Sequence, residues 1–512
     1  MKATDTLHKL IQSLSKAEKR NFKLYVSRYN SKEKNNYIKL FEIIEKQDIY
    51  NEAEVKNQLI GEKFLKHLPS EKNYLYNLLL ESLQLLHADE ILIYKLKNRI
   101  QQAAILLKRG LADQSIKILK RVKETAQQNE LYAVILDALQ VEKQVVTRNY
   151  FAGYAQTELD AIYTEEKKCI ALIAETNEYW RLFSTFYRFH YGKGSVRDVA
   201  GWNQVKAIFA HPLLSDFSRA RTFQTQLDFL HIHALYYFMN GEPAKAYDFN
   251  MRQLALLESR PDKMKDYRKR YQATLNNLLM DGLNLGLYDE VEKGIAKLRR
   301  LASDTDDKNL QQRADVYRLT TILELNVILK RGNFEPGYLR LQPLQKELEL
   351  YEKHIVKHNL LTIYYLFAYV SFGAGKYKDS VRWLARIIND AEEDVLQDIH
   401  AFARIFSLIV HYELKNHDLL DYLNQQTVRY LNKRSKFYRA ENILLKNLKK
   451  LSAVTHSAKA LEKIFKNMET ELLPLAQDEN ERKAFEYFDI ISWIESKLSK
   501  KDFAYIVQAK NS

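Results

Sequence analysis

Apolar residues recur at intervals of three and four along most of the chain, which is the period of an amphipathic α-helix. In residues 1 to about 88 the first such stretch covers 7–14 and predicts a short helix. Ser15 and Glu18 follow with the spacing of a capping box, which predicts that a second helix begins there. Further helices are predicted around 37–44, 51–59 and 70–83. No apolar–polar alternation is long enough to predict a sheet.

From about residue 90, long helical stretches alternate with turns that contain glycine or asparagine. The turn residues are Gly110, Gly153, Gly194, Gly241, Gly286, Gly332, Gly375 and Asn416. Successive members are separated by 43, 41, 47, 45, 46, 43 and 41 positions. A period in this range is typical of helix pairs stacked into a solenoid. Glycine suits the end of a helix because it adopts the left-handed backbone conformation at the lowest cost.

Composition supports an all-α fold. The 512 residues include only 14 glycines and 7 prolines, whereas average usage would give roughly 36 and 26. Because both residues interrupt helices, their scarcity favours long helices joined by short turns. Helix signals end near Ile506, so the tail from Phe503 to Ser512 is predicted to fray.

The turns resemble those of tetratricopeptide (TPR) repeats, a family that places an aromatic residue two positions after the turn glycine and a small residue five positions after it. The matching sets are Gly286 with Tyr288, Gly332 with Phe334 and Gly337, and Gly375 with Tyr377 and Ser380. Gly110 and Gly241 keep only the small residue, as Ser115 and Ala246, and Val291 departs from the pattern.

This resemblance covers roughly residues 90 to 460 and implies a right-handed solenoid of helical hairpins. Its period exceeds the usual TPR length of about 34 and falls in the HEAT and armadillo range of about 40–47. The chain is therefore either TPR-like with longer helices or another α-solenoid. The predicted organisation is a basic helical domain over 1–88, a TPR-like solenoid over 89–460, and C-terminal capping helices with a tail over 461–512.

The cysteine content, the lack of a visible targeting signal and the net charge indicate in which compartment the protein is expected and which partners its charge would favour. A single cysteine, Cys169, excludes an intramolecular disulfide and fits a reducing compartment. No secretory signal and no long apolar run are visible, so a cytoplasmic protein without a membrane span is expected. The formal net charge of +14 is compatible with an acidic partner, and equally with the solubility of long surface helices.

Motifs for chemistry are weak. The sequence contains no GxxxxGK[ST], GxGxxG or GxSxG pattern. His354 and His358 are spaced to share one face of a predicted helix, but no third metal ligand accompanies them. His231 and His233 fall on different helix faces, and Cys169 lies among apolar residues that favour packing over reactivity. We therefore expect no enzyme activity, no cofactor and no metal.

Aromatic residues gather on the first helices of several predicted hairpins. The candidate partner-binding residues are Tyr179, Trp180, Tyr236, Tyr237, Tyr364, Tyr365 and Tyr369. In TPR-like arrays the first helix lines the concave face, where aromatic side chains are good peptide anchors. The alternative is packing between helices, and consecutive aromatic residues cannot all face one side.

Two basic stretches suggest contact with phosphate groups. Lys16, Lys19, Arg20 and Lys23 fall on one stripe of a predicted helix, and a second stretch contains Lys433, Arg434 and Lys436. This arrangement is typical of a phosphate-contacting helix, and also of an ordinary solvated face. The helices between Asn51 and Leu83 are joined by too long a connection for a helix-turn-helix.

Two functions follow from these patterns. The first is a non-enzymatic scaffold or adaptor that binds a protein or peptide on a TPR-like concave surface. The second is a nucleic-acid-binding regulatory protein, in which the basic N-terminal helices bind the nucleic acid and the solenoid acts as a sensor.

Overall fold

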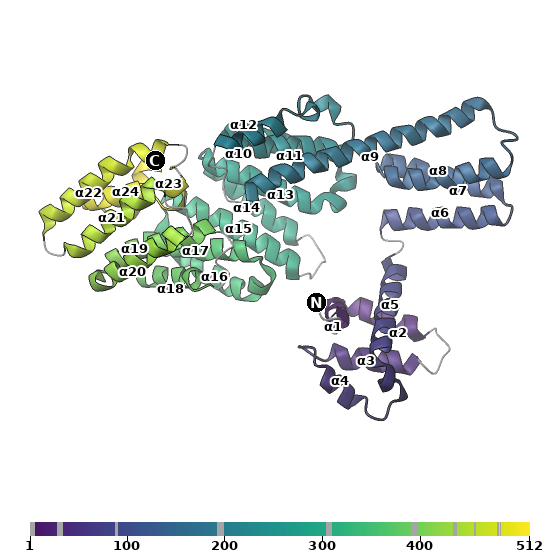
Figure 1. The fold of residues 1–512 in the computed structure, drawn as a ribbon, viewed down its shortest axis with the longest axis horizontal. Helices are drawn as coiled ribbons and strands as arrows, with labels where there is room; N and C mark the ends of the chain where they lie inside the picture. The colour runs from purple at the N-terminus through teal and green to yellow at the C-terminus, as the bar shows by residue number, and fades with distance from the viewer. Residues whose placement is uncertain are drawn as a thin grey trace. The chain divides into compact units, whose positions relative to one another are not determined.

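The computed structural model is entirely helical in the part of the chain that it describes. This part comprises residues 6–27, 34–87, 91–191, 199–303, 310–390, 397–433, 438–454, 457–478, 481 and 483–511. Within these ranges there are 25 α-helices, six short 3-10 helices and no strand (Figure 1). The all-α prediction is therefore confirmed. The chain divides into two compact units, Met1–Glu175 and Thr176–Ser512, called unit 1 and unit 2 below.

Unit 1 begins with helices that pack around a core of their own and are short except for α5, which has 20 residues. They are α1 (Thr6–Ser13), α2 (Lys16–Ser27), α3 (Lys34–Glu45), α4 (Glu52–Gln58), η1 (Lys63–His67) and α5 (Leu68–His87). The capping box at the start of α2 is confirmed, because the Ser15 amide donates to Glu18 Oε2 at 2.7 Å and the Glu18 amide donates to Ser15 Oγ at 3.2 Å. Phe22 and Val26 of α2 pack into this core with Phe41 and Leu79.

The rest of unit 1 is built from longer helices with a second core. These are α6 (Leu92–Lys108), α7 (Ala112–Gln128), α8 (Tyr132–Arg148) and the first part of α9 (Gln156–Tyr191). Cys169 of α9 is buried in this core. Helix α9 runs without interruption for 36 residues, and the turn expected at Gly194 lies outside the described residues.

Unit 2 continues from the second part of α9 as a series of helices that pair mostly with their neighbours in sequence. The first are α10 (Val199–Phe209), η2 (Pro212–Leu214), η3 (Phe217–Arg219), α11 (Phe223–Met239), α12 (Pro243–Glu258), η4 (Pro261–Lys263), α13 (Met264–Asn284), α14 (Tyr288–Ser303), α15 (Leu310–Arg331) and α16 (Phe334–Tyr351). They are followed by η5 (Glu352–His354), α17 (Lys357–Gly373), α18 (Tyr377–Ile388), α19 (Gln397–Glu413), α20 (His417–Lys433), α21 (Arg439–Ala453) and α22 (Ala458–Leu472).

The predicted turns reverse the chain between successive helices. Gly110, Gly153, Gly241, Gly286, Gly332 and Gly375 all have positive φ, between 70° and 83°. At the last expected turn the left-handed residue is Lys415, with φ 59°, and Asn416 follows it. A turn without glycine, centred on Glu130 with φ 58°, separates α7 from α8 and gave no glycine signal in the sequence.

The residue five positions after the left-handed turn residue is buried in several hairpins. Ser115, Ala246 and Ser380 are fully buried, and the Ser115 hydroxyl donates to the carbonyl of Ala103 in the preceding helix. A Cβ atom added to Gly337 would lie 2.4 Å from the Ile328 side chain of α15. The small side chain at this position therefore allows the two helices of a hairpin to approach closely.

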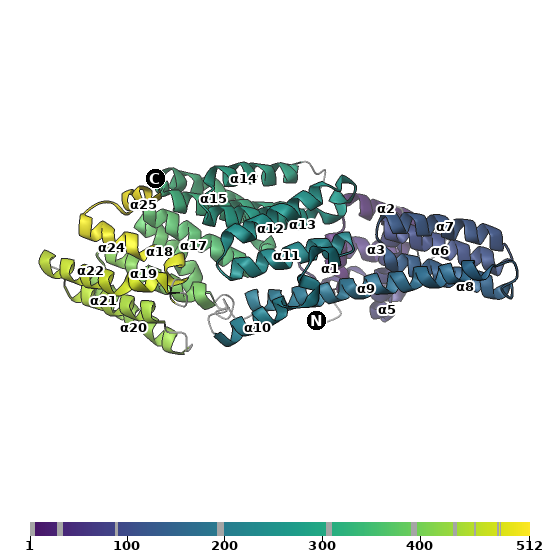
Figure 2. The ribbon, with the colours of Figure 1, turned by 90° about the horizontal axis from the view of Figure 1, so that it is seen from above.

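The C-terminal helices return to the repeats of unit 2. They are η6 (Pro474–Gln477), α23 (Lys483–Tyr487), α24 (Ile490–Ser499) and α25 (Phe503–Asn511). Helix α24 packs beside α22 (Figure 2), and Gln508 of α25 donates to the carbonyl oxygen of Gly332 at 3.0 Å. The predicted fraying of the tail is wrong, because Phe503 and Val507 anchor α25 in the core.

Candidate functional site

Four of the seven aromatic candidates lie in the interior of unit 2. Tyr179, Tyr364, Tyr365 and Tyr369 are buried, and the Tyr179 hydroxyl donates to the carbonyl oxygen of Leu213 at 2.8 Å. Burial raises the pKa of Tyr364 to about 12, with a further contribution from its hydrogen bond to Glu352. For these four residues the packing alternative describes the structure, because their side chains are not exposed to a partner.

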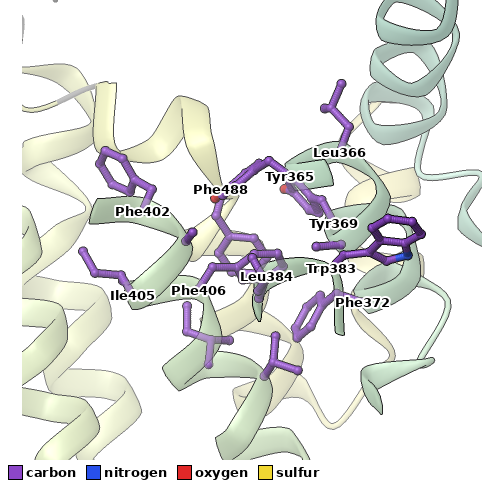
Figure 3. Packing of buried hydrophobic residues seen from close by; sticks show 14 of the residues in the cluster. Tyr365, Leu366, Tyr369, Phe372, Trp383, Leu384, Phe402, Ile405, Phe406 and Phe488 are labelled. Carbon is purple, nitrogen blue, oxygen red and sulfur yellow. The ribbon is translucent and has the colours of Figure 1, made fainter. Parts of the chain in front are cut away.

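The C-terminal segment covers two of these residues. Tyr369 of α17 packs against Phe488 at 5.1 Å between ring centroids, and its hydroxyl accepts a hydrogen bond from the Asp489 amide at 2.9 Å. Tyr365 lies against Phe406 of α19 and Tyr487 of α23. Figure 3 shows Tyr365, Tyr369, Phe406 and Phe488 in one cluster. Residues of the C-terminal segment therefore cover the side of α17 that carries Tyr365 and Tyr369.

The two tyrosines are expected to respond oppositely to removal of the hydroxyl group. The Tyr365 hydroxyl is buried and has no hydrogen-bond partner among the described residues, so Tyr365→Phe should raise the free energy of unfolding by about 1 kcal/mol. Tyr369→Phe should lower it by about 1 kcal/mol, because the Asp489 amide loses its acceptor. Urea unfolding of both variants followed by circular dichroism measures the difference. Equal effects of the two substitutions would contradict this account of the cluster.

The other three candidates reach the surface. Trp180 of α9 is 66% exposed, and Tyr236 and Tyr237 of α11 are half-buried. Phe209 stacks on Tyr236 with 3.7 Å between ring centroids, and Phe249 stacks on Tyr237 at 5.5 Å.

These four rings, Phe209, Tyr236, Tyr237 and Phe249, are called the aromatic surface below. Cationic side chains lie over it, with Lys245 Nζ 5.0 Å from the Tyr237 ring centroid and the Arg252 guanidinium 5.0 Å from that of Phe249. Large rings beside positive charges provide both apolar contact area and attraction for an acidic or aromatic partner.

The histidine and cysteine candidates have structural roles. His233 is buried between Phe229 and Phe249, its Nδ1 lies 2.8 Å from the Phe229 carbonyl oxygen, and burial lowers its pKa. His354 belongs to η5 and His358 to α17, so the expectation that they share one helix is wrong. Burial raises the pKa of Cys169, which disfavours the reactive thiolate. Across the described ranges, no group of three or more metal-ligating side chains is assembled.

The structure brings the first basic stretch together on α2. Lys16, Lys19, Arg20 and Lys23 line an open hollow of about 410 Å³, together with Leu24 and Glu45. We call these six residues the basic hollow. Lys19 Nζ lies 3.1 Å from Glu45 Oε1, and Lys23 Nζ lies 2.8 Å from Glu42 Oε1. The sequence pattern does not reveal these acidic partners on α3, because they lie 19 and 26 positions from their lysines and carry no motif.

The second basic stretch is described only in part. Lys433 is exposed at the end of α20 in unit 2. Arg434 and Lys436 lie outside the described residues.

Unit 1 contains a short connection between its first two helices, as the helix predicted over 7–14 and the capping box at Ser15 indicate. Only Leu14 and Ser15 separate α1 from α2. The capping box at Ser15 was the available signal, because it fixes where the second helix begins.

Comparison with known proteins gives no family for this chain. No model of a protein family matches it, and a search of curated proteins finds no relative. Among the helices that the structure describes, none combines the length and the apolar character needed to cross a bilayer.

Proposed function

We propose that this protein is a non-enzymatic scaffold that binds a protein or peptide through a TPR-like array of helical hairpins. The observation that carries the proposal is the aromatic surface on α10, α11 and α12, where half-buried rings lie beside Lys245 and Arg252. Exposed aromatic and arginine side chains are the residues most enriched at binding hot spots. The repeated turns and the buried small residues after them support closely packed helical hairpins, and the right-handed solenoid is what the resemblance to TPR repeats implies.

The burial of Tyr365 and Tyr369 narrows this proposal. The C-terminal helices cover α17, so the part of the array available to a partner is at α9 to α12. Of the seven aromatic candidates, Trp180, Tyr236 and Tyr237 then remain as anchors for a partner.

Affinity capture from host extract tests the scaffold function. The full-length chain, Tyr237→Ala and Trp180→Ala are compared with Tyr422→Ala, which removes an exposed tyrosine from α20. The wild type and Tyr422→Ala should capture the same proteins. Tyr237→Ala or Trp180→Ala should capture at least about tenfold less of each, because truncation of a hot-spot residue costs about 2 kcal/mol or more of binding free energy. All variants must retain wild-type helicity. An identical set of captured proteins for all four chains would argue against both Trp180 and the aromatic surface as binding sites for a partner.

A second candidate function is nucleic-acid binding through the basic hollow. The observation in its favour is that four cationic side chains from one helix line a single hollow, while the opposite face of that helix is anchored by Phe22 and Val26. Binding through phosphate contacts should weaken steeply with salt. If the full-length chain binds neither DNA nor RNA at about 50 mM salt, this candidate is excluded.

A further inference from the structure

Helices α1 and α2 have the connectivity of a helix-turn-helix. Helix α1 ends at Ser13 and α2 begins at Lys16, and helix boundaries are defined to within about one or two residues. Leu14 and Ser15 lie between the two helices, and within that tolerance the connection agrees with the turn of about three to four residues in this motif. The turn is fixed by the Ser15–Glu18 capping box and by burial of Leu14 in the core.

Both helices are held by the same neighbours. Leu7 and Ile11 of α1, and Phe22 and Val26 of α2, belong to one apolar core with residues of α3 and α5. Helix α2 is also tied to α5 by polar contacts. Asn21 donates to the Ser82 hydroxyl at 3.3 Å, and the Tyr25 hydroxyl donates to Glu81 at 3.1 Å. The orientation of α2 is thus set before any ligand binds.

The outward face of α2 is cationic. Lys16 and Arg20 are exposed and one turn apart, and Leu24 follows one turn later with 54% of its surface exposed. Lys19 and Lys23 flank this face on the α3 side, where they pair with Glu45 and Glu42. The exposed face of α2 therefore carries Lys16 and Arg20 along its middle, and Lys19 and Lys23 lie along the edge next to α3.

We propose that α1 and α2 form a helix-turn-helix and that α2 enters the major groove of duplex DNA. This inference rests on the second candidate function, nucleic-acid binding through the basic hollow. Lys16 and Arg20 face the groove, where lysine and arginine contact guanine or phosphate oxygens. Lys19 and Lys23 contact a flanking phosphate backbone.

The shape of the site favours duplex DNA over other nucleic acids. The major groove of B-form DNA, about 12 Å wide, admits one α-helix, whereas the major groove of A-form RNA is too narrow and deep for side chains to read. Proteins that bind single strands stack the bases on exposed aromatic rings. The outward face of α2 carries Lys16, Arg20 and Leu24 instead, and its ring at Tyr25 is engaged with Glu81 on α5.

Neutralising the acidic partners on α3 should raise the affinity for DNA, whereas removing the cations of α2 should lower it. Surface ion pairs are weak, so phosphate can displace Glu42 and Glu45 from their lysines. The two carboxylates nevertheless compete with phosphate and repel it. The double variant Glu42→Gln/Glu45→Gln should therefore bind DNA several-fold more tightly than the wild type, an effect that a merely structural role of these residues would not produce.

The experiment uses the full-length chain and three labelled probes of about 20 nucleotides or base pairs. These are a mixed-sequence DNA duplex, one of its strands alone, and an RNA duplex of the same sequence. Affinity is measured by fluorescence anisotropy from about 50 to 200 mM salt. The DNA duplex should bind at least about tenfold more tightly than either other probe at about 50 mM salt.

Two double variants that each remove two positive charges locate the contact. Lys16→Ala/Arg20→Ala should weaken duplex binding about tenfold or more, and should flatten the slope of log affinity against log salt by about 2. Lys63→Ala/Lys66→Ala removes two exposed lysines of η1 in the same unit and should leave the slope nearly unchanged. Circular dichroism confirms that both remain helical.

Each other outcome has a defined meaning. Equal or tighter binding of the single strand or the RNA duplex, still lost in Lys16→Ala/Arg20→Ala, overturns the duplex inference and retains nucleic-acid binding. If none of the three probes binds, both the helix-turn-helix inference and nucleic-acid binding through the basic hollow are overturned. Equal losses in the two double variants show that general charge rather than α2 is responsible, and this also overturns the inference.

Discussion

Replacing Trp493 with alanine is expected to lower the free energy of unfolding by about 4 kcal/mol, as for other large buried aromatic residues. Trp493 of α24 has no exposed surface. Its ring meets Phe465 of α22 and Tyr412 of α19 edge to face, and its Nε1 donates to Glu413 Oε1 at 2.7 Å. The substitution leaves a cavity where the C-terminal helices join the repeats.

Trp180 supplies a control of the same residue type, because its side chain is 66% exposed. Trp180→Ala should change the free energy of unfolding by no more than about 0.5 kcal/mol. Urea unfolding followed by far-ultraviolet circular dichroism gives both values on the same scale. If the two tryptophan variants had similar midpoints, α24 could not be an integral part of the core of unit 2.

The helices and many of their turns could be predicted because their signals are local. The capping box at Ser15 needs only a residue three positions away, and a turn glycine such as Gly375 needs only its own backbone conformation. The turn at Glu130 was missed because a non-glycine residue takes the left-handed conformation there. At the last turn the sequence indicates Asn416, but Lys415, also a non-glycine residue, takes the left-handed conformation.

The exposure of the aromatic residues could not be predicted from adjacent residues. Tyr369 is covered by residues near Asp489, 120 positions away, and Gly332 meets Gln508, 176 positions away. The sequence of α17 did indicate that its tyrosines are buried, because this helix is apolar on nearly every side and such a helix is typically buried. The basic stripe on α2 could be predicted because its successive members are no more than three positions apart, whereas Glu42 and Glu45 belong to another helix.

Unit 2 also buries a carboxyl group whose protonation is linked to stability. Asp281 of α13 is buried, and Asn250 Nδ2 of α12 donates to its Oδ2 at 2.7 Å. Burial raises its pKa from 3.8 to about 7. The folded chain therefore holds this proton more tightly than the unfolded chain does. The contribution to stability is greatest below about pH 4 and is lost as the pH rises to about 7.

Asp281→Asn should remove this pH dependence. The introduced amide has nearly the same shape and stays neutral, so the variant should be more stable than the wild type at pH 8. A pKa raised to about 7 corresponds to a gain of about 4 kcal/mol there, and the gain should grow by about 3 kcal/mol between pH 5 and pH 8. Urea unfolding of both chains at the two pH values measures this difference, and the titration of other groups cancels between them.

The buried Asp228 of α11 provides a control with the opposite sign. Its Oδ1 accepts a hydrogen bond from Arg270 Nη1 at 2.7 Å. Asp228→Asn therefore leaves a partly buried guanidinium without its counterion and should destabilise the fold by about 3 kcal/mol at pH 8. If Asp281→Asn instead lowered stability at pH 8, or if its effect were the same at pH 5, the pKa of Asp281 could not be raised in the folded chain. These two buried aspartates of unit 2 thus distinguish a carboxylate that is stabilised by a cation from a carboxyl group whose ionisation is disfavoured by burial.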